Sequence, residues 1–174
     1  SWGLKRINLS VAWAITDGDP ETVVAVLDTG CESGSGDLAG QVVDEWDFVD
    51  DDDTAQDEAG HGTMMAGLIA GSADGLGIVG VAPGVKLICG RVASGIGVAE
   101  YGTIAAGVDW AVESGASVVF IGFGGFGLGE GLAQLEEAVE EAAAADVVVV
   151  APSGSAGGAN LDLFPAAFGP AVIS

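Results

Sequence analysis

Four short runs of nearly uninterrupted apolar residues alternate along this chain with longer segments of helical periodicity. The apolar runs cover residues 22–28, 85–92, 117–121 and 146–151, and the helical segments cover residues 61–71, 99–113 and 130–145. Continuous Val, Ile and Leu runs of this length are typical of strands that are buried on both faces of a parallel sheet. Strands that alternate with helices predict βαβ crossovers. We therefore predict an α/β fold with a mainly parallel, doubly wound sheet and helices on both faces.

The composition indicates one folded domain with a strong negative charge. The chain has 174 residues, of which 49% are hydrophobic, and a mean hydropathy of +0.51. Such a chain can bury a substantial core, so we expect residues 1–174 to form a single domain. The formal charge of −22 would repel nucleic acid and anionic membranes, and it fits a cation-binding, secreted or salt-adapted protein. No apolar run reaches the roughly 18 residues of a membrane span, and no leader pattern opens the chain. We therefore expect neither a membrane-spanning helix nor a leader peptide in this sequence.

The two cysteines, Cys31 and Cys89, form at most one disulfide and do not decide the redox compartment. Cys89 lies within a predicted strand, and Cys31 follows the Asp-Thr-Gly sequence that ends another. These positions favour two free, buried thiols.

Asp28 and His61 are the first candidates for chemistry. Asp28 ends a predicted strand, where open α/β sheets place their ligand sites. His61 is the only histidine, and its flanking glycines allow other backbone to approach the imidazole closely. An Asp at a strand end and a His at a helix start can form an orienting hydrogen bond. Three alternatives remain: an Asp that caps a turn, a structural His, and an aspartic protease, which would need a second Asp-Thr-Gly sequence or a homodimer and an all-β chain.

Several sequences around and beyond these residues match one known pattern. They are Val26-Leu27-Asp28-Thr29-Gly30, Gly60-His61-Gly62-Thr63-Met64-Met65-Ala66-Gly67, Gly80-Val81-Ala82-Pro83, Tyr101–Trp110, Val147–Gly157 and Phe164-Pro165-Ala166. Together they resemble the subtilisin-like serine proteases, including the spacing of 33 residues between Asp28 and His61, although Met64 stands where His is usual. The resemblance runs from Trp2 to the last residue and covers about the first two thirds of a family domain. It implies the subtilisin-like fold and a catalytic role for Asp28 and His61.

The chain departs from this family at three places that matter for catalysis. The Gly-Thr-Ser-Met-Ala motif that carries the nucleophile is absent, Ser155 replaces the Asn of the oxyanion hole, and Gly122-Phe123-Gly124 replace the Ser-Leu-Gly of the substrate-pairing strand. An Asp–His pair without its nucleophile cannot form an acyl-enzyme, and one lost oxyanion donor alone costs about 10² to 10³ in rate. The resemblance implies a substrate groove formed by Tyr101, Gly122, Phe123, Gly124, Ser153 and Gly154. Packing of a helix stripe explains Tyr101 equally well.

Three functions are consistent with these residues. We expect a subtilisin-like domain that lacks the segment with the nucleophilic Ser and serves as a pseudo-protease, that is, a binding, regulatory or structural module. The alternative is the N-terminal portion of an active calcium-dependent endopeptidase whose Ser segment is on another chain or was not included. An unrelated α/β binding protein is the third. We expect a secreted or extracellular location, and as partner a peptide or protein, including a complementary chain or a second copy on an apolar surface beside Val147–Ala151.

A loop at residues 44–58 holds nine carboxylates in fifteen residues. Alternate oxygen donors on a tight loop can converge on one hard cation such as Ca²⁺, whereas an isolated acidic run is usually only a solvated surface. Residues 46–62 resemble, without a gap, the calcium loop of thermitase-like subtilases. The resemblance implies a Ca²⁺ site formed by Asp47, Asp50, Asp52, the carbonyl of Thr54, and Gln56.

A second, weaker calcium site is implied by the family's loop before Gly80-Val81-Ala82-Pro83. Its alternative is a flexible turn rich in Gly and Asp. Its ligands would be Asp37, Asp74 and the carbonyl groups of Ser72, Leu76 and Ile78.

Overall fold

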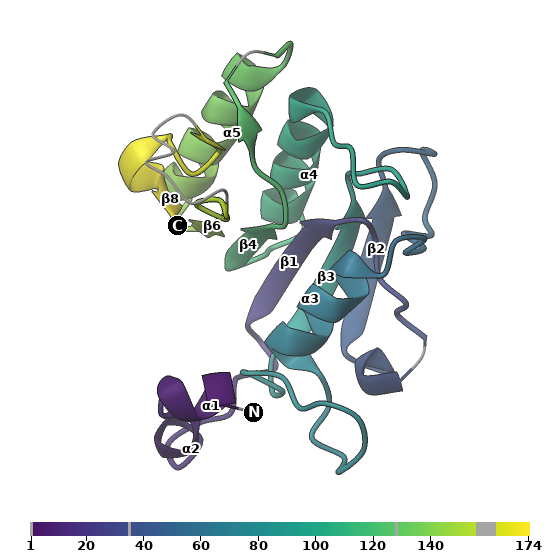
Figure 1. The fold of residues 1–174 in the computed structure, drawn as a ribbon, viewed down its shortest axis with the longest axis vertical. Helices are drawn as coiled ribbons and strands as arrows, with labels where there is room; N and C mark the ends of the chain where they lie inside the picture. The colour runs from purple at the N-terminus through teal and green to yellow at the C-terminus, as the bar shows by residue number, and fades with distance from the viewer. Residues whose placement is uncertain (1, 35, 128, 156–162) are drawn as a thin grey trace.

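The computed structural model describes residues 2–34, 36–127, 129–155 and 163–174, and in this part of the chain the predicted parallel sheet is present. Six parallel strands lie in the order β2-β3-β1-β4-β6-β8 (Figure 1). Their bounds are β1 Val23–Asp28, β2 Val42–Asp47, β3 Lys86–Arg91, β4 Val118–Ile121, β6 Val148–Val150 and β8 Val172–Ile173. A separate antiparallel pair consists of β5 Gly125–Phe126 and β7 Leu163–Phe164. The four apolar runs of the sequence therefore form β1, β3, β4 and β6.

Strand β2 corrects the prediction that residues 44–58 form only a loop. Val42–Asp47 pairs with β3 at the edge of the sheet, and only its last residue, Asp47, is buried. Edge strands lack a neighbour on one side and tolerate charged side chains. Asp44 is exposed and Glu45 is half-buried on β2, and these charged residues are why the strand did not stand out as an apolar run.

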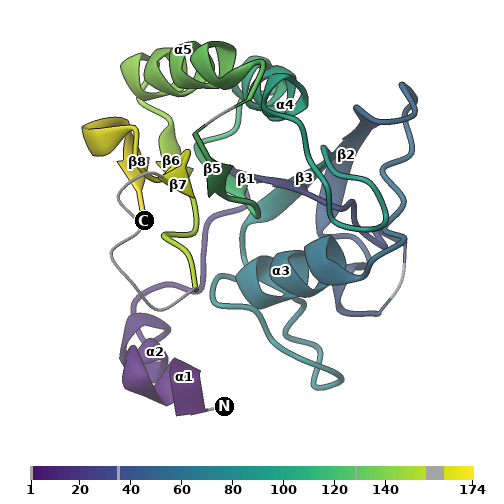
Figure 2. The same ribbon diagram turned by 45° about the horizontal axis from the view of Figure 1, so that its top comes forward.

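The helices cover the two faces of the sheet, as the α/β prediction required. Helices α4 and α5 pack side by side on one face, and α3 lies on the other, while α1 and α2 stand apart near the N-terminus (Figures 1 and 2). Their bounds are α1 Trp2–Arg6, α2 Leu9–Ala12, α3 His61–Ala70, α4 Tyr101–Glu113 and α5 Leu132–Ala144, with short 3₁₀ turns at Gly36–Leu38 and Gly169–Ala171. No described helix is long and apolar enough to cross a membrane.

Strand β1 is buried on both faces and divides the core into two clusters. Leu27 points with Val108 and Leu135 into the cluster between the sheet and helices α4 and α5. Val26 points with Ala66 into the cluster under α3. Burial of each large side chain contributes roughly 1.5–3 kcal/mol, and the continuous apolar run of β1 supplies both clusters at once. The C-terminal residue of β1, Asp28, is thereby held in a fixed position.

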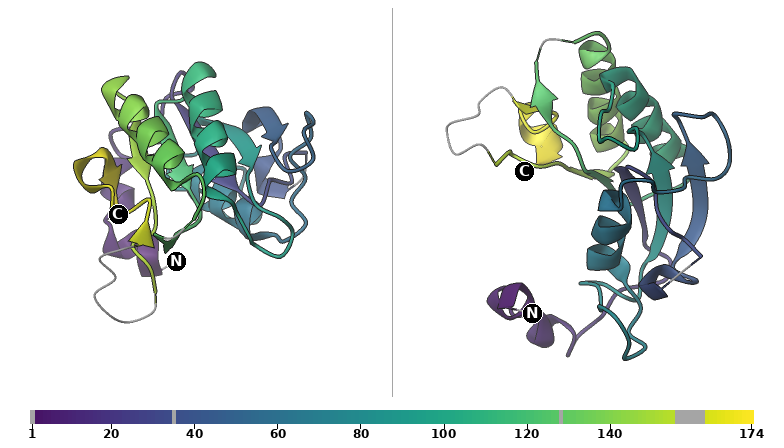
Figure 3. Two further views of the ribbon diagram at one scale, coloured as in Figure 1. Left: turned by 90° about the horizontal axis from the view of Figure 1, so that it is seen from above. Right: turned by 45° about the vertical axis from the view of Figure 1, so that its right-hand side comes forward.

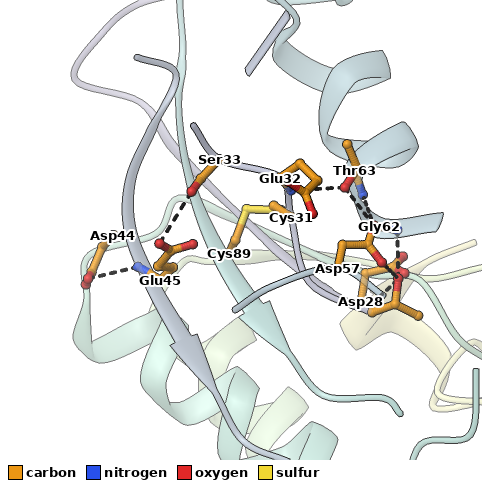
Figure 4. Close-up of a disulfide and its surroundings, with 11 residues drawn as sticks. Asp28, Cys31, Glu32, Ser33, Asp44, Glu45, Asp57, Gly62, Thr63 and Cys89 are labelled. Carbon is orange, nitrogen blue, oxygen red and sulfur yellow. Dashed lines mark hydrogen bonds between the residues drawn. A yellow bond between two sulfur atoms is a disulfide. The ribbon is translucent and has the colours of Figure 1, made fainter. Parts of the chain in front are cut away.

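Cys31 and Cys89 form a disulfide, which corrects the prediction of two free thiols (Figure 4). Cys89 lies in β3 directly beside Val26 of β1, and Cys31 lies in the loop that follows β1. Both are buried in the cluster under α3, and their Cα atoms are 6.2 Å apart. The two residues are 58 positions apart in sequence, so only the pairing of β1 with β3 brings them together.

One half of the sheet has no helix on the α3 side within the described residues. Figures 2 and 3 show α3 over the half that contains β1 and β3, away from β6 and β8. On the open side, Val148 is 42% exposed and Ile173 is 61% exposed, whereas their neighbours Val149 and Val172 are buried under the opposite helices. Strands β6 and β8 are therefore apolar on both faces although no described helix covers the α3 side, whereas Val118 and Phe120 of β4 still pack against the cluster under α3.

Candidate active site

Asp28 and His61 meet at the C-terminal edge of the sheet, as the sequence predicted. His61 Nδ1 lies 2.8 Å from Asp28 Oδ1 and 2.9 Å from Oδ2. The backbone N–H of Thr29 also donates to Asp28 Oδ1, at 2.7 Å. The carboxylate is fully buried, while the imidazole is 44% exposed. The pair therefore presents a buried anion behind a histidine that solvent or a ligand can reach.

The hydrogen bond to Asp28 indicates which ring nitrogen of His61 carries the proton. An ionised carboxylate only accepts hydrogen bonds, so Nδ1 of His61 must carry the proton that it shares with Asp28. The neutral ring then has its free lone pair on Nε2, the atom that acts as a general base in an Asp–His pair. Geometry alone gives His61 the chemistry of a proton acceptor held in one tautomer.

Two glycines permit this close approach. A Cβ atom on Gly62, the second residue of α3, would collide with the carbonyl oxygen of Gly30 and lie 3.0 Å from Asp28 Cβ. A Cβ on Gly122, just after β4, would collide with Asp28 Oδ2. The start of α3 and the end of β4 thus both lie against Asp28, and Figure 4 shows Gly62 beside its carboxylate. Gly122, predicted as a groove residue, forms part of the wall around Asp28.

Asp57, which was not among the predicted site residues, is a second buried carboxylate behind the pair. It is 8% exposed and accepts five hydrogen bonds of 2.7–3.0 Å. The donors are the hydroxyl groups of Thr29 and Thr63 and the backbone N–H groups of Ala59, Gly60 and Thr63. Burial opposes its ionisation, but the hydrogen bonds together outweigh that effect and hold its pKa below the usual range.

Comparison with known proteins agrees with this geometry. The pattern of the subtilase family (Peptidase_S8) matches residues 19–166. The chain belongs to the subtilase family. It is 38% identical to thermitase from Thermoactinomyces vulgaris over 157 residues, which are 90% of this chain and 55% of thermitase. It is 34% identical to an intracellular serine protease of Paenibacillus polymyxa, covering 89% of this chain and 48% of that protein. It is 34% identical to subtilisin Savinase from Lederbergia lenta, covering 98% of this chain and 61% of that protein. The chain spans about half to three fifths of the length of these relatives.

A groove of this subtilase comes next to the histidine at Phe123. A cavity of about 350 Å³ is lined by Tyr101 and Ile104 of α4, by Phe123 to Phe126, by residues 97–99 and by Phe164. The Phe123 ring centre is 6.2 Å from that of His61, and the Tyr101 hydroxyl donates to the Phe126 carbonyl at 2.9 Å. Burial raises the pKa of Tyr101. Three predicted groove residues, Tyr101, Phe123 and Gly124, are thereby brought together beside the pair.

The loop after β6 contributes less to the described site. Ser153, Gly154 and Ser155 are exposed, and within the described residues no hydrogen bond joins Ser153 or Ser155 to His61. The carbonyl of Pro152 would lie 3.5 Å from a Cβ atom on Gly124, so this loop begins next to the groove. The last two residues of the predicted Val147–Gly157 motif lie outside the described residues.

A buried arginine that no sequence pattern indicated lies against the acidic loop. Arg91 Nη1 is 2.6 Å from Asp47 Oδ2 and 2.6 Å from Asp50 Oδ2, and Nη2 is 3.5 Å from Glu58 Oε2. Burial opposes the charge of Arg91, but Asp47 and Asp50 outweigh it and raise its pKa. One guanidinium thus neutralises part of the loop. Its Nε has no described partner.

The predicted calcium ligands are partly gathered. Asp47 and Asp52 face each other through two backbone hydrogen bonds, and Asp52 Oδ1 accepts from the N–H of Thr54 at 2.9 Å. In the described part of the chain, no three His, Cys, Asp or Glu side chains are grouped as a metal site requires. Gln56 lies in the same loop, where its carbonyl packs against Gly30.

The second predicted calcium loop is held by Asp37. Its Oδ2 accepts from the N–H of Ile78 at 2.9 Å, and its carbonyl accepts from the N–H of Ser72 at 2.8 Å. Asp74 instead accepts from the N–H of Leu76 within its own turn, at 2.9 Å. The structure therefore joins Asp37 to Ser72 and Ile78, while Asp74 serves its local turn with Leu76.

A pair of matched substitutions tests the packing of α3 against Asp28. Gly62 and Gly102 are the second residues of α3 and α4, and alanine is favoured over glycine in either helix by up to about 1 kcal/mol. Gly62→Ala should nevertheless destabilise the protein by about 1–3 kcal/mol, because its methyl group meets backbone. Gly102→Ala meets only the end of the Gln134 side chain, 3.3 Å away, and should leave stability unchanged or slightly higher. Thermal unfolding by circular dichroism measures both, and equal shifts in Tm would contradict this packing.

Proposed function

We propose that this chain is a subtilase scaffold that retains the Asp–His pair and binds peptides or proteins without cleaving them. The observation that carries the proposal is the pair itself, built and oriented beside an apolar groove, in a chain whose sequence has no Gly-Thr-Ser-Met-Ala motif. A base without its nucleophile cannot begin acyl transfer. The groove remains suited to an extended peptide, with Phe123 and Tyr101 as its apolar contacts.

The second candidate function is the N-terminal portion of an active, calcium-dependent serine endopeptidase. The good geometry of Asp28 and His61 favours it, because an intact pair is of little use to a purely structural module. In that case the nucleophile lies on another chain or in a segment that the sequence of 174 residues does not include. The relatives, which extend well beyond the matched region, support this candidate equally.

Activity-based labelling tests whether the residues of this chain are catalytic by themselves. A fluorophosphonate reacts with a serine only when a nucleophile, its histidine and an oxyanion hole are assembled, because the reagent mimics acylation. We expect no labelling of this chain and no cleavage of casein, with or without Ca²⁺. Ser153 and Ser155 would have to move to reach His61. Stoichiometric labelling that disappears in His61→Ala would show that a nucleophile within this chain is used, and the non-catalytic function would be wrong.

We also propose that Ca²⁺ binds the acidic loop. The donors Asp47, Asp50, Asp52, Thr54 and Gln56 are all oxygen ligands, which Ca²⁺ prefers. Residues 47–53 hold five aspartates, of which Arg91 pairs with only two, Asp47 and Asp50, so this guanidinium leaves most of their negative charge without a described ion-pair partner. Asp52 keeps one carboxylate oxygen that no described hydrogen bond uses. A bound cation would draw Asp52 toward the Asp47 and Asp50 pair. Asp37 and the 72–78 loop are the weaker proposal.

Chelation tests the calcium proposal. At a Ca²⁺ concentration 100 times its Kd, binding to the folded state adds about 2.7 kcal/mol, so excess chelator should lower Tm by about 5–10 °C. Asp52→Asn should abolish that shift, while Asp53→Asn, with the same change of charge in the same loop, should keep it. If chelator leaves the Tm of the unmodified protein unchanged, this loop binds no calcium.

The uncovered half of the sheet supports the proposal of a protein partner. Apolar patches of this kind usually mark an interface. Val148 and Ile173 are exposed there, and Trp2, Ile7 and Val11 of the N-terminal segment are 59–84% exposed. We propose that a complementary polypeptide or a second copy covers these residues.

Solution measurements test this surface. We expect a dye that fluoresces on apolar surfaces to bind the isolated chain, or light scattering to show a dimer or larger species at physiological salt. Val148→Lys combined with Ile173→Lys should reduce both signals, whereas Val43→Lys, an exposed apolar residue on the opposite edge strand, should not. A monodisperse monomer without dye binding would contradict the proposal.

A secreted or extracellular location remains a proposal with one structural support. Disulfides persist in oxidising compartments and are rare in the cytosol. The buried Cys31–Cys89 bond is therefore more compatible with export than two free thiols would be. Two relatives are named intracellular proteases, so family membership does not decide the location.

A further inference from the structure

The start of α3 lacks an ordinary capping residue. Its N-cap position is Gly60, which has no side chain to accept the free N–H groups of the first turn. Asp57, three residues earlier, takes this role: Oδ1 accepts from Gly60 at 2.7 Å, and Oδ2 accepts from the N–H and the hydroxyl of Thr63 at 2.8 and 2.7 Å. The first turn of α3, which begins with His61, is therefore fixed from outside the helix.

Thr29 connects the same carboxylate to the strand that carries Asp28. Its hydroxyl donates to Asp57 Oδ1 at 2.7 Å and accepts from the N–H of Gly62 at 3.0 Å. Its own N–H donates to Asp28 Oδ1. Thr29 thus contacts one carboxylate through its backbone and the other through its side chain, and it is only 1% exposed. Figure 4 shows Asp57 beside Asp28, with Gly62 and Thr63 above it.

We infer that Asp57 is a positioning residue for the Asp28–His61 pair, an inference that rests on the proposed role of that pair. Asp57 and Thr29 link the residue after Asp28 to the residues on both sides of His61, so they set the distance between β1 and the imidazole. Asp57 itself does not touch His61 in any described hydrogen bond. It acts through the position of the α3 backbone.

The chemistry of the contact explains why a carboxylate serves here. All five groups that face Asp57 donate, three to Oδ1 and two to Oδ2. An asparagine with its oxygen at the Oδ1 position could accept the three hydrogen bonds there. Its NH₂ group would then stand at the Oδ2 position and face the N–H of Thr63, donor against donor. The network is therefore matched to two acceptor oxygens, and loss of either one should loosen the first turn of α3.

Nuclear magnetic resonance of the only histidine tests this inference directly. We expect the unmodified protein to show a single Nδ1–H tautomer of His61, with a slowly exchanging, low-field proton held by Asp28. In Asp57→Ala that proton should exchange about ten- to a hundredfold faster, as expected when a charge-assisted hydrogen bond is lost, and the second tautomer should become populated. In Asp57→Asn the exchange rate of this proton should lie between those of the unmodified protein and of Asp57→Ala. Asp28→Asn is the positive control, because it removes the acceptor itself.

Two further variants separate positioning from simple stability. Val139→Ala leaves a cavity in the core under α5, on the face of the sheet opposite α3. It should lower Tm without changing the His61 signal. Thr29→Val removes the hydroxyl bridge while keeping side-chain shape, and should reproduce the effect of Asp57→Asn. This variant decides the question if Asp57→Ala does not fold. An unchanged His61 signal in folded Asp57→Ala, or in Thr29→Val, would overturn the inference. The signal is independent of any nucleophile, so this outcome is separate from that of fluorophosphonate labelling.

Discussion

A buried carboxylate at the end of the central strand imposes the main constraint on this structure. Asp28 is fully buried, and a buried charge is tolerated only when it is paired and hydrogen-bonded. Here the partners are the N–H of Thr29 and the imidazole of His61. Because His61 is the first residue of α3, the position of that helix follows from the need to compensate Asp28. The glycines that face the carboxylate, Gly62 and Gly122, are consequences of the same constraint, since any side chain there would push α3 or β4 away from it.

The parallel sheet explains how residues far apart in sequence reach this point. Strands β1 and β4 are hydrogen-bonded neighbours and run in the same direction, so the chain leaves both at the same edge of the sheet. Asp28 ends β1, and Gly122 to Gly124 follow β4. The groove next to His61 is therefore built from a loop after one strand and from the first turns of α4. This is the place where open α/β sheets commonly bind ligands, at the carboxyl ends of their strands.

The sequence predicted the elements and the pair better than it predicted the contacts behind them. Apolar runs identified four strands because these strands carry apolar residues on both faces, and β2 escaped because charged residues interrupt it. Asp28 and His61 were found through motifs that are local in sequence. The disulfide, the hydrogen bond between Thr29 and Asp57, and the ion pairs of Arg91 join segments separated by 28 to 58 residues, which no local pattern encodes. A signal for Asp57 did exist: an acidic residue shortly before a helix whose N-cap position is glycine.

The acidic loop is connected to the Asp–His pair by hydrogen bonds, by the ion pairs of Arg91 and by the disulfide. The far end of the loop lies against the chain that leaves β1, where the N–H of Cys31 donates to the carbonyl of Ala55 at 2.8 Å and Gly30 packs on the carbonyl of Gln56. The next residue is Asp57, which fixes the first turn of α3. At its near end the loop is held to β3 by Arg91, and β3 is joined to Cys31 by the disulfide. Any cation that orders residues 47–56 therefore restricts the backbone on both sides of the pair without touching it. The calcium site proposed above would therefore lie in the same bonded framework as His61.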